Sequence, residues 1–234
     1  MIHGPSVGIG AGITAVVIIV AFFALDNFSD QKELVMEQTP DVDEVGPPKI
    51  TMATFLENTS PVLGNPNAPI TLVEFGDYQC HFCNVFFHNT EDRILKNFIE
   101  TGKVKMFFKD FTIIGPDSVT AAHGAHCADD QGMFWEYHDI LYNNWEGENN
   151  GWASSDNLLK FAQEIDLDID TWSECMTNSK HSQIILESNN DGKDLGLTGT
   201  PSFFVISPDN KVTKLFGAQP YSQFERIFNS MLEN

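Results

Sequence analysis

Two cysteines separated by two residues are the part of this sequence with the clearest chemical potential. Cys80 and Cys83 lie in the segment "QCHFCN", with His81 directly after the first cysteine. Such a pair can bind a metal ion, form a structural disulfide, or exchange electrons as a dithiol. A disulfide that closes so short a loop restricts the unfolded chain very little, so a purely structural role would add little stability.

The remaining cysteines and histidines do not complete a zinc site around this pair. Cys127 and Cys175 stand alone, and His123 and His126 do not have the spacing of a zinc finger. A structural zinc site would need a second close pair of ligands. The sequence therefore favours redox chemistry, while a copper-carrying domain that uses the cysteine pair and a histidine is kept as an alternative.

The elements on either side of the pair would position it for redox chemistry. The apolar run "APITLVEF" (68–75) predicts a buried strand that leads towards Cys80, and the apolar spacing over 84–102 predicts a helix that follows it. The unpaired N–H groups in the first turn of a helix favour a thiolate over a thiol. We therefore expect Cys80 to be the attacking sulfur and Cys83, one turn further along, to be the resolving one.

The rest of the chain predicts a mixed sheet covered by helices. The predicted elements are strands at 104–111, 201–206 and 211–217, a long helical stretch at about 117–194 and a last helix at 222–232. A strand, a helix and a second strand in succession indicate a parallel pair with a right-handed crossover. The short connection at 207–210 indicates an antiparallel pair. An α/β sheet with helices on both faces satisfies both relations.

The N-terminal region differs in composition from the remainder of the 234 residues. After a short tail (1–6), residues 7–25 are almost wholly apolar and long enough to cross a membrane. We expect one retained transmembrane helix here, with a cleaved signal peptide or a buried core helix as alternatives. Residues 26–48 are acidic and rich in proline, which is typical of an extended linker to a domain at 49–234.

The formal net charge of −20 is informative about partners. Such a charge argues against nucleic-acid binding, because phosphate groups would be repelled. It is compatible with a soluble domain outside the cytoplasm.

Three segments together resemble a known family. The segments "VEFGDYQCHFC", "QGMFWEYHDILYNN" and "GLTGTPSFFVI" are similar to those of DsbA-like thiol–disulfide oxidoreductases of the thioredoxin superfamily. The resemblance extends over roughly residues 50–234. It implies a thioredoxin-like mixed sheet flanked by helices, with an inserted helical subdomain at about 115–194.

The resemblance also implies roles for individual residues. Cys80 and Cys83 match the active-site pair, and Pro201 matches the cis-proline that faces this pair, preceded by Thr200. The free-energy cost of a cis peptide bond is low almost only before proline. Here such a bond would turn the backbone of Thr200 towards an extended peptide. Glu74 matches the buried carboxylate beneath the active site. The alternatives are a trans proline that begins an edge strand and a solvated acid at a strand end.

Further expectations concern neighbours of the pair. Lys109, on the next predicted strand, could form an ion pair with Glu74, and His138 is expected to pack within a helix rather than to act in catalysis. The family often has proline where this chain has His81. A protonated His81 would stabilise the Cys80 thiolate and make the disulfide a stronger oxidant. Alternatively, this histidine is an exposed residue that contacts substrate.

The function implied by the resemblance is that of a membrane-anchored, extracytoplasmic thiol oxidase. It would oxidise cysteine pairs in unfolded or reduced exported proteins without a cofactor or a metal ion. A membrane quinone-linked thiol oxidase, of the DsbB or vitamin-K-epoxide-reductase-like kind, would re-oxidise it. An isomerase or reductase with chaperone activity is the alternative. We also expect a structural disulfide between Cys127 and Cys175, since free accessible thiols in such an enzyme would risk unwanted oxidation.

Overall fold

The computed structural model describes residues 50–233 of the chain. The predicted tail, transmembrane helix and acidic linker lie outside this range, and their prediction stays open. Within residues 50–233, no helix combines the length and the apolar character that crossing a membrane requires.

The elements follow one another in the order expected for the predicted α/β fold. They are α1 (Met52–Leu56), β1 (Ile70–Gly76), α2 (His81–Phe86), η1 (Phe87–Glu91), α3 (Asp92–Ile94), η2 (Leu95–Ile99), β2 (Val104–Asp110), α4 (Pro116–Asp129), α5 (Phe134–Asn143), α6 (Ser155–Glu164), α7 (Ile169–Thr177), α8 (Ser182–Asp194), β3 (Ser202–Ile206), β4 (Val212–Phe216) and α9 (Tyr221–Leu232). The segments η1 and η2 are π-helical turns, and with α2 and α3 they form one run of helix after β1.

The strands form a mixed sheet in the spatial order β2-β1-β3-β4. Strands β1 and β2 are parallel, whereas β3 pairs antiparallel with both β1 and β4. The prediction of one parallel pair and one antiparallel hairpin is therefore confirmed. The parallel pair needs a long crossover, which the helical run from α2 to η2 supplies.

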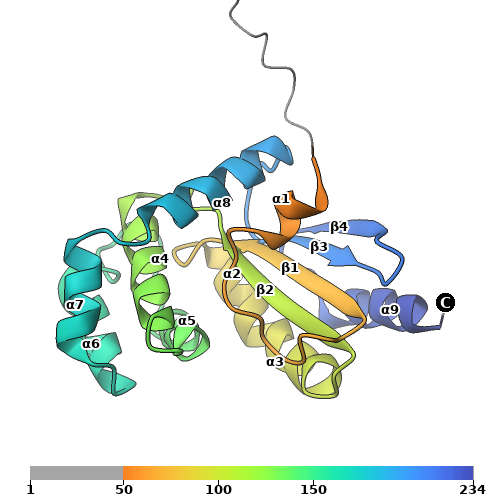
Figure 1. Ribbon diagram of the computed structural model, residues 1–234, viewed down its shortest axis with the longest axis horizontal. Helices are drawn as coiled ribbons and strands as arrows, with labels where there is room; N and C mark the ends of the chain where they lie inside the picture. Colours follow the sequence, from red (N-terminus) through yellow and green to blue (C-terminus); the bar gives the residue numbers. More distant parts are fainter. Residues whose placement is uncertain (1–49, 234) are drawn as a thin grey trace, which may run out of the picture. The chain divides into compact units, whose positions relative to one another are not determined.

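The two faces of the sheet carry different helices (Figure 1). On one face, Ile70 and Leu72 of β1 pack with Phe86 of α2 and with Phe224 and Phe228 of α9. On the other face, Val73 and Phe75 of β1 pack with Phe55 of α1 and with Leu195 at the end of α8. Because successive side chains of a strand point to opposite faces, the face of each residue in β1 and β2 follows from its position.

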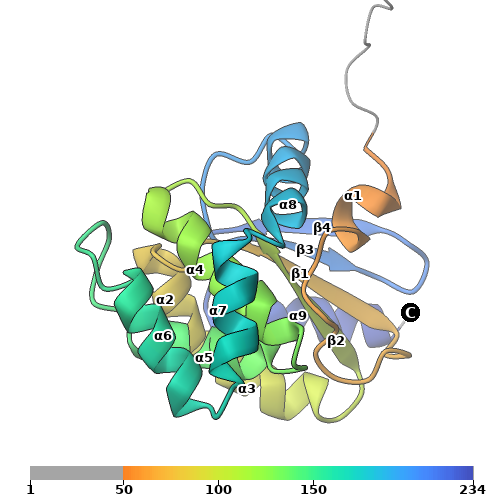
Figure 2. The same ribbon diagram turned by 60° about the vertical axis from the view of Figure 1, so that its left-hand side comes forward.

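The helical insertion forms a second apolar cluster beside the sheet. Figure 2 shows α4, α5, α6 and α7 packed together there. Their buried side chains are continuous with Cys80, Cys83 and Phe108 at the sheet. Within this block, Cys127 of α4 and Cys175 of α7 are joined by a disulfide with an S–S distance of 2.00 Å. The apolar core therefore extends from the helical block to the dithiol.

The predicted ion pair between Lys109 and Glu74 is wrong. The register places Lys109 beside Phe75, while Glu74 lies beside Phe108, so the two charged side chains point to opposite faces of the sheet. The Lys109 ammonium instead pairs with Asp191 of α8 at 2.7 Å and donates a hydrogen bond to the Glu57 carbonyl.

Candidate active site

Cys80 lies where β1 has ended and α2 begins. It is the N-cap residue of α2, and its N–H donates to the Asp77 carbonyl at 2.9 Å. Its thiol lies 3.3 Å from the carbonyl oxygen of Thr200, two residues before β3. Cys80 is 5% exposed and Cys83 is fully buried, so only Cys80 can be reached from solvent. Both are free thiols in this structure.

The surroundings give the two thiols opposite acidities. The pKa of Cys80 is lowered to about 6, chiefly by a hydrogen bond from the Cys83 side chain and also by the backbone N–H groups of Phe82 and Cys83, while burial acts in the other direction. Burial raises the pKa of Cys83 well above its ordinary value, and the neighbouring Cys80 adds to this effect. At neutral pH the reduced pair therefore holds a thiolate at Cys80 and a thiol at Cys83.

A buried carboxyl group lies in the electrostatic environment of both thiols. Glu74 of β1 is 1% exposed, and its Oε2 atom has no hydrogen-bond partner. Burial raises the pKa of Glu74 well above its ordinary value, and the nearby Glu91 and Cys80 raise it further. Glu74 is thus a buried acid that can hold a proton near the dithiol, and not a solvated residue at a strand end.

Apolar side chains are exposed around the reactive thiol. The Thr200–Pro201 peptide bond is cis, and the Pro201 carbonyl accepts a hydrogen bond from Gly217 at the end of the β3–β4 hairpin. Next to it Phe216 is 55% exposed, and Phe82, between the two cysteines, is 59% exposed. Exposed apolar groups beside a reactive thiol suit contact with an unfolded polypeptide.

Gln79, directly before Cys80, connects the dithiol segment to the helical insertion. Its side chain donates to Ser118 Oγ at 3.2 Å and accepts from the Asn149 N–H at 2.8 Å. Its carbonyl accepts from the Trp145 indole at 2.8 Å, and its N–H donates to Asp77 at 2.9 Å. The role of Gln79 could not be predicted from the sequence, because its partners in the helical insertion are 39 to 70 positions away and no local pattern indicates them.

His81 is exposed at the first position of α2 and lies beside two aromatic rings. Its ring centroid lies 5.5 Å from that of Trp145 and 5.3 Å from that of Phe82. Its backbone N–H donates to a carboxylate oxygen of Glu148 at 3.0 Å. The proposed effect of its imidazole on the Cys80 thiolate stays a prediction.

His138 is fully buried in an aromatic cluster. Its Nδ1 atom lies 3.1 Å from the Tyr78 hydroxyl, and its ring contacts Phe108, Trp135 and Tyr142. These contacts fit the predicted packing role.

One cluster of residue types that can bind metal ions lies away from the dithiol, in the described part of the chain. The Cys127 and Cys175 sulfurs and a nitrogen of His181 lie within 4.8 Å of one another. Both sulfurs belong to the disulfide, so neither is a thiolate that could bind a metal ion.

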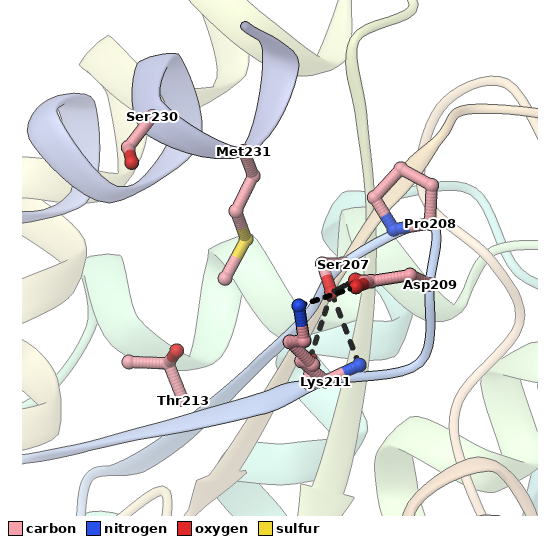
Figure 3. Close-up of a pocket in the computed structure, with 7 residues that line it drawn as sticks. All are labelled: Ser207, Pro208, Asp209, Lys211, Thr213, Ser230 and Met231. Carbon is pink, nitrogen blue, oxygen red and sulfur yellow. Dashed lines mark hydrogen bonds and ion pairs between the residues drawn. The ribbon is translucent and has the colours of Figure 1, made fainter. Parts of the chain in front are cut away.

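A surface pocket of about 380 Å³ lies away from the dithiol. It is formed by the β3–β4 turn and the end of α9, with Lys211 paired to Asp209 at 2.7 Å (Figure 3). Strand β3 begins beside Pro201 and runs to this turn, and five residues of strand span about 17 Å. The pocket therefore has no part in the thiol chemistry.

An accessible thiol of low pKa, backed by a buried thiol and set on a thioredoxin-like fold, is suited to dithiol–disulfide exchange. The chain is accordingly a thiol–disulfide oxidoreductase. The family model described as thioredoxin matches residues 56–227, so the chain belongs to that family.

Relatives of known name agree with this class. The chain is 29% identical over 159 residues to disulfide bond formation protein D of Bacillus subtilis, covering 67% of this chain and 70% of that protein. It is 28% identical over 155 residues to a probable disulfide bond formation protein D of Bacillus cereus, covering 64% and 72%. Among solved structures, oxidised BdbD of Bacillus subtilis has a TM-score of 0.67 at 26% identity and covers 74% of this chain and 93% of that chain.

Proposed function

We propose that this protein oxidises cysteine pairs in exported proteins, from a position outside the cytoplasm. The observation that carries the proposal is the Cys80 thiol with a pKa of about 6. Stabilising the thiolate favours the reduced form of the pair, which makes the Cys80–Cys83 disulfide an oxidant. The names of the relatives, which refer to disulfide bond formation, support the same direction.

The first step is attack by a substrate thiolate on the Cys80 sulfur. A bond forms between the substrate sulfur and Cys80, and the Cys80–Cys83 bond breaks. Cys83 leaves as a thiolate and takes up a proton, and the buried carboxyl of Glu74, which acts electrostatically on Cys83, can donate it. Because Cys83 is fully buried, the substrate can attack only at Cys80.

The second step releases the oxidised substrate. A second substrate thiolate attacks the substrate sulfur of the mixed disulfide, and Cys80 leaves as the thiolate that its surroundings stabilise. Two electrons pass from the substrate to the cysteine pair. Of the two protons lost by the substrate thiols, the equivalent of one is on Cys83 and the other is in solvent.

The location and the recycling of the enzyme are part of the proposal. Residues 7–25 would anchor the chain in the cell membrane as a single span, and the acidic linker 26–48 would hold the domain away from it. A membrane quinone-linked thiol oxidase would remove the two electrons from the reduced pair. Full-length protein should therefore remain with membranes after a carbonate wash, and recovery of a mature chain that lacks residues 1–25 would contradict the anchor.

The test of the activity uses the oxidised protein and a reduced, unfolded model protein. We expect stoichiometric formation of substrate disulfides by the oxidised protein. Neither Cys80→Ser nor Cys83→Ala should oxidise the substrate, because neither variant can form the Cys80–Cys83 disulfide that accepts the two electrons. The glutathione equilibrium of the pair, measured in parallel, distinguishes an oxidase from a reductase. If the protein only reactivates a scrambled substrate and does not oxidise a reduced one, the isomerase alternative is correct.

A further inference from the structure

Buried polar atoms without hydrogen-bond partners gather near the dithiol. In the described residues, such atoms include Glu74 Oε2, Glu91 Oε2, His138 Nε2 and the Tyr142 hydroxyl. Buried polar groups in folded proteins are nearly always paired, so a group of unpaired ones needs an explanation. Exchange of a proton among these groups is an explanation that fits their chemistry.

The members of this group come from three parts of the fold. Glu74 lies on β1, Glu91 ends η1, and His138 and Tyr142 lie on α5. The distance from His138 Nε2 to Glu91 Oε1 is 3.7 Å, and His138 Nδ1 is 3.1 Å from the Tyr78 hydroxyl. The electrostatic effects of Glu74 on Cys83 and of Glu91 on Glu74 connect the group to the buried thiol.

Glu91 is the member that also borders solvent. A surface pocket of about 230 Å³ is lined by Phe87, His88, Glu91, Asp92, Leu95 and Asp139. Glu74 is not part of that lining and is 1% exposed, whereas Glu91 is 7% exposed. Glu91 therefore lines an opening to water and also acts electrostatically on the buried acid Glu74.

We propose that Glu91 transfers protons between water in this pocket and the buried carboxyl group of Glu74. When substrate attack expels Cys83 as a thiolate, Glu74 gives Cys83 its proton. Glu91 then returns a proton from solvent to Glu74. In re-oxidation the same proton moves outwards. The inference rests on the thiol–disulfide exchange of the proposed function, and it holds whether the protein oxidises or reduces its substrate.

The charges around Glu74 favour its protonated form. A negative charge in or beside a desolvated site opposes the ionisation of a buried carboxyl group. Burial raises the pKa of Glu74, and the negative charge of Glu91 raises it further. The other titratable side chains that face them are Cys80, Cys83, Tyr78, His138, Asp139 and Tyr142.

The test measures the rate at which a small dithiol reduces the Cys80–Cys83 disulfide, as a function of pH. Glu91→Gln removes the negative charge, so the pKa of Glu74 should fall. The basic limb of the pH profile should then move down by about one pH unit, which makes reduction about tenfold slower above the limb. The infrared band of the protonated Glu74 carboxyl should titrate at a correspondingly lower pH.

The matched control is Glu100→Gln, the same chemical change at an exposed acid. Glu100 follows η2 on the same helical run and is not among the residues that line the pocket, so its loss should leave the profile unchanged. Glu91→Asp keeps the charge and should give a profile between those of wild type and Glu91→Gln, which keeps the test valid if the glutamine variant folds poorly. In a Glu74→Gln background, Glu91→Gln should cause no further shift.

Three outcomes would overturn the inference. One is a Glu91→Gln profile and infrared titration that superimpose on wild type. Another is an equal shift in Glu100→Gln, which would indicate a general effect of surface charge. The third is a full additional shift in the Glu74→Gln background. Because a small dithiol replaces the protein substrate, a failure of the proposed oxidation of exported proteins would leave this measurement intact and would be recognised separately.

Discussion

The acidity of Cys80 predicts how the stability of the reduced protein depends on pH. Its pKa is about 6 in the folded state, against an ordinary value of 9.0. A lowered pKa stabilises the folded state when the group is ionised. The contribution is complete above the unfolded pKa and is lost as the pH falls through the folded pKa. We therefore expect the reduced protein to gain stability from about pH 6 upwards through the action of this one thiol.

The size of the effect follows from the two pKa values. Linkage gives a contribution from Cys80 of about 0.1 kcal/mol at about pH 5, about 1.4 kcal/mol at about pH 7 and about 2.7 kcal/mol at about pH 8. Cys80 lies at the surface opening of the active site, so solvent screening reduces these figures, and we expect between about half and all of them.

The assay compares the free energy of unfolding of wild type with that of Cys80→Ser. Both are unfolded in urea with a phosphine reductant that is active over this pH range. The same reductant opens the Cys127–Cys175 disulfide in both proteins, so their difference isolates Cys80. The wild-type advantage should increase from about pH 5 to about pH 8 by about 1.3 to 2.6 kcal/mol. A difference that stays constant with pH would refute the assignment of a low pKa to this thiol.

Three further predictions concern residues outside the dithiol. Lys109→Met removes the cation that pairs with the partly buried Asp191 carboxylate and leaves it only the hydrogen bond from Asn58. Urea unfolding should show a loss of about 3 kcal/mol, whereas an unchanged midpoint would mean that the pair contributes nothing net. Replacing Cys127 and Cys175 by alanine opens a loop of 48 residues, so calorimetry without reductant should show a loss of up to about 4 kcal/mol, with the reactivity of the dithiol retained. Glu148→Gln removes the negative charge that accepts a hydrogen bond from the N–H of His81, next to Cys80. Thiolate absorbance should therefore show a lower Cys80 pKa, and a higher one would contradict this account.

Much of the sheet could be predicted because its signals are local. Short apolar runs bounded by turn residues located all four strands to within two residues, and the connection at 207–210 indicated the hairpin. The helix after the cysteines was expected at 84–102, and helical structure begins at His81 and reaches Ile99. The short helix α1 was missed, since five residues carry too little periodicity to be recognised.

The partners of the charged residues could not be predicted, because they depend on strand register and long-range packing. Glu74 and Lys109 lie on adjacent strands, and a shift of one residue decides whether they share a face. The same holds for Glu91, whose position near Glu74 depends on how the helical run packs against the sheet. Sequence patterns locate elements, whereas these contacts are fixed by their three-dimensional arrangement.

The hydrogen bonds at Gln79 and Cys80 have a consequence for the order in which the chain becomes functional. Gln79 bonds to partners 39, 66 and 70 positions later, and Cys80 to Thr200, 120 positions later. A growing or partly exported chain that ends near residue 150 already contains both cysteines but lacks Thr200 and β3. Contacts at such separation form late, so the nascent dithiol lacks the Thr200 contact that helps to lower the pKa of Cys80. The local contribution of Cys83 and of the first turn of α2 can form earlier, whereas the full acidity of Cys80 requires the domain to be nearly complete.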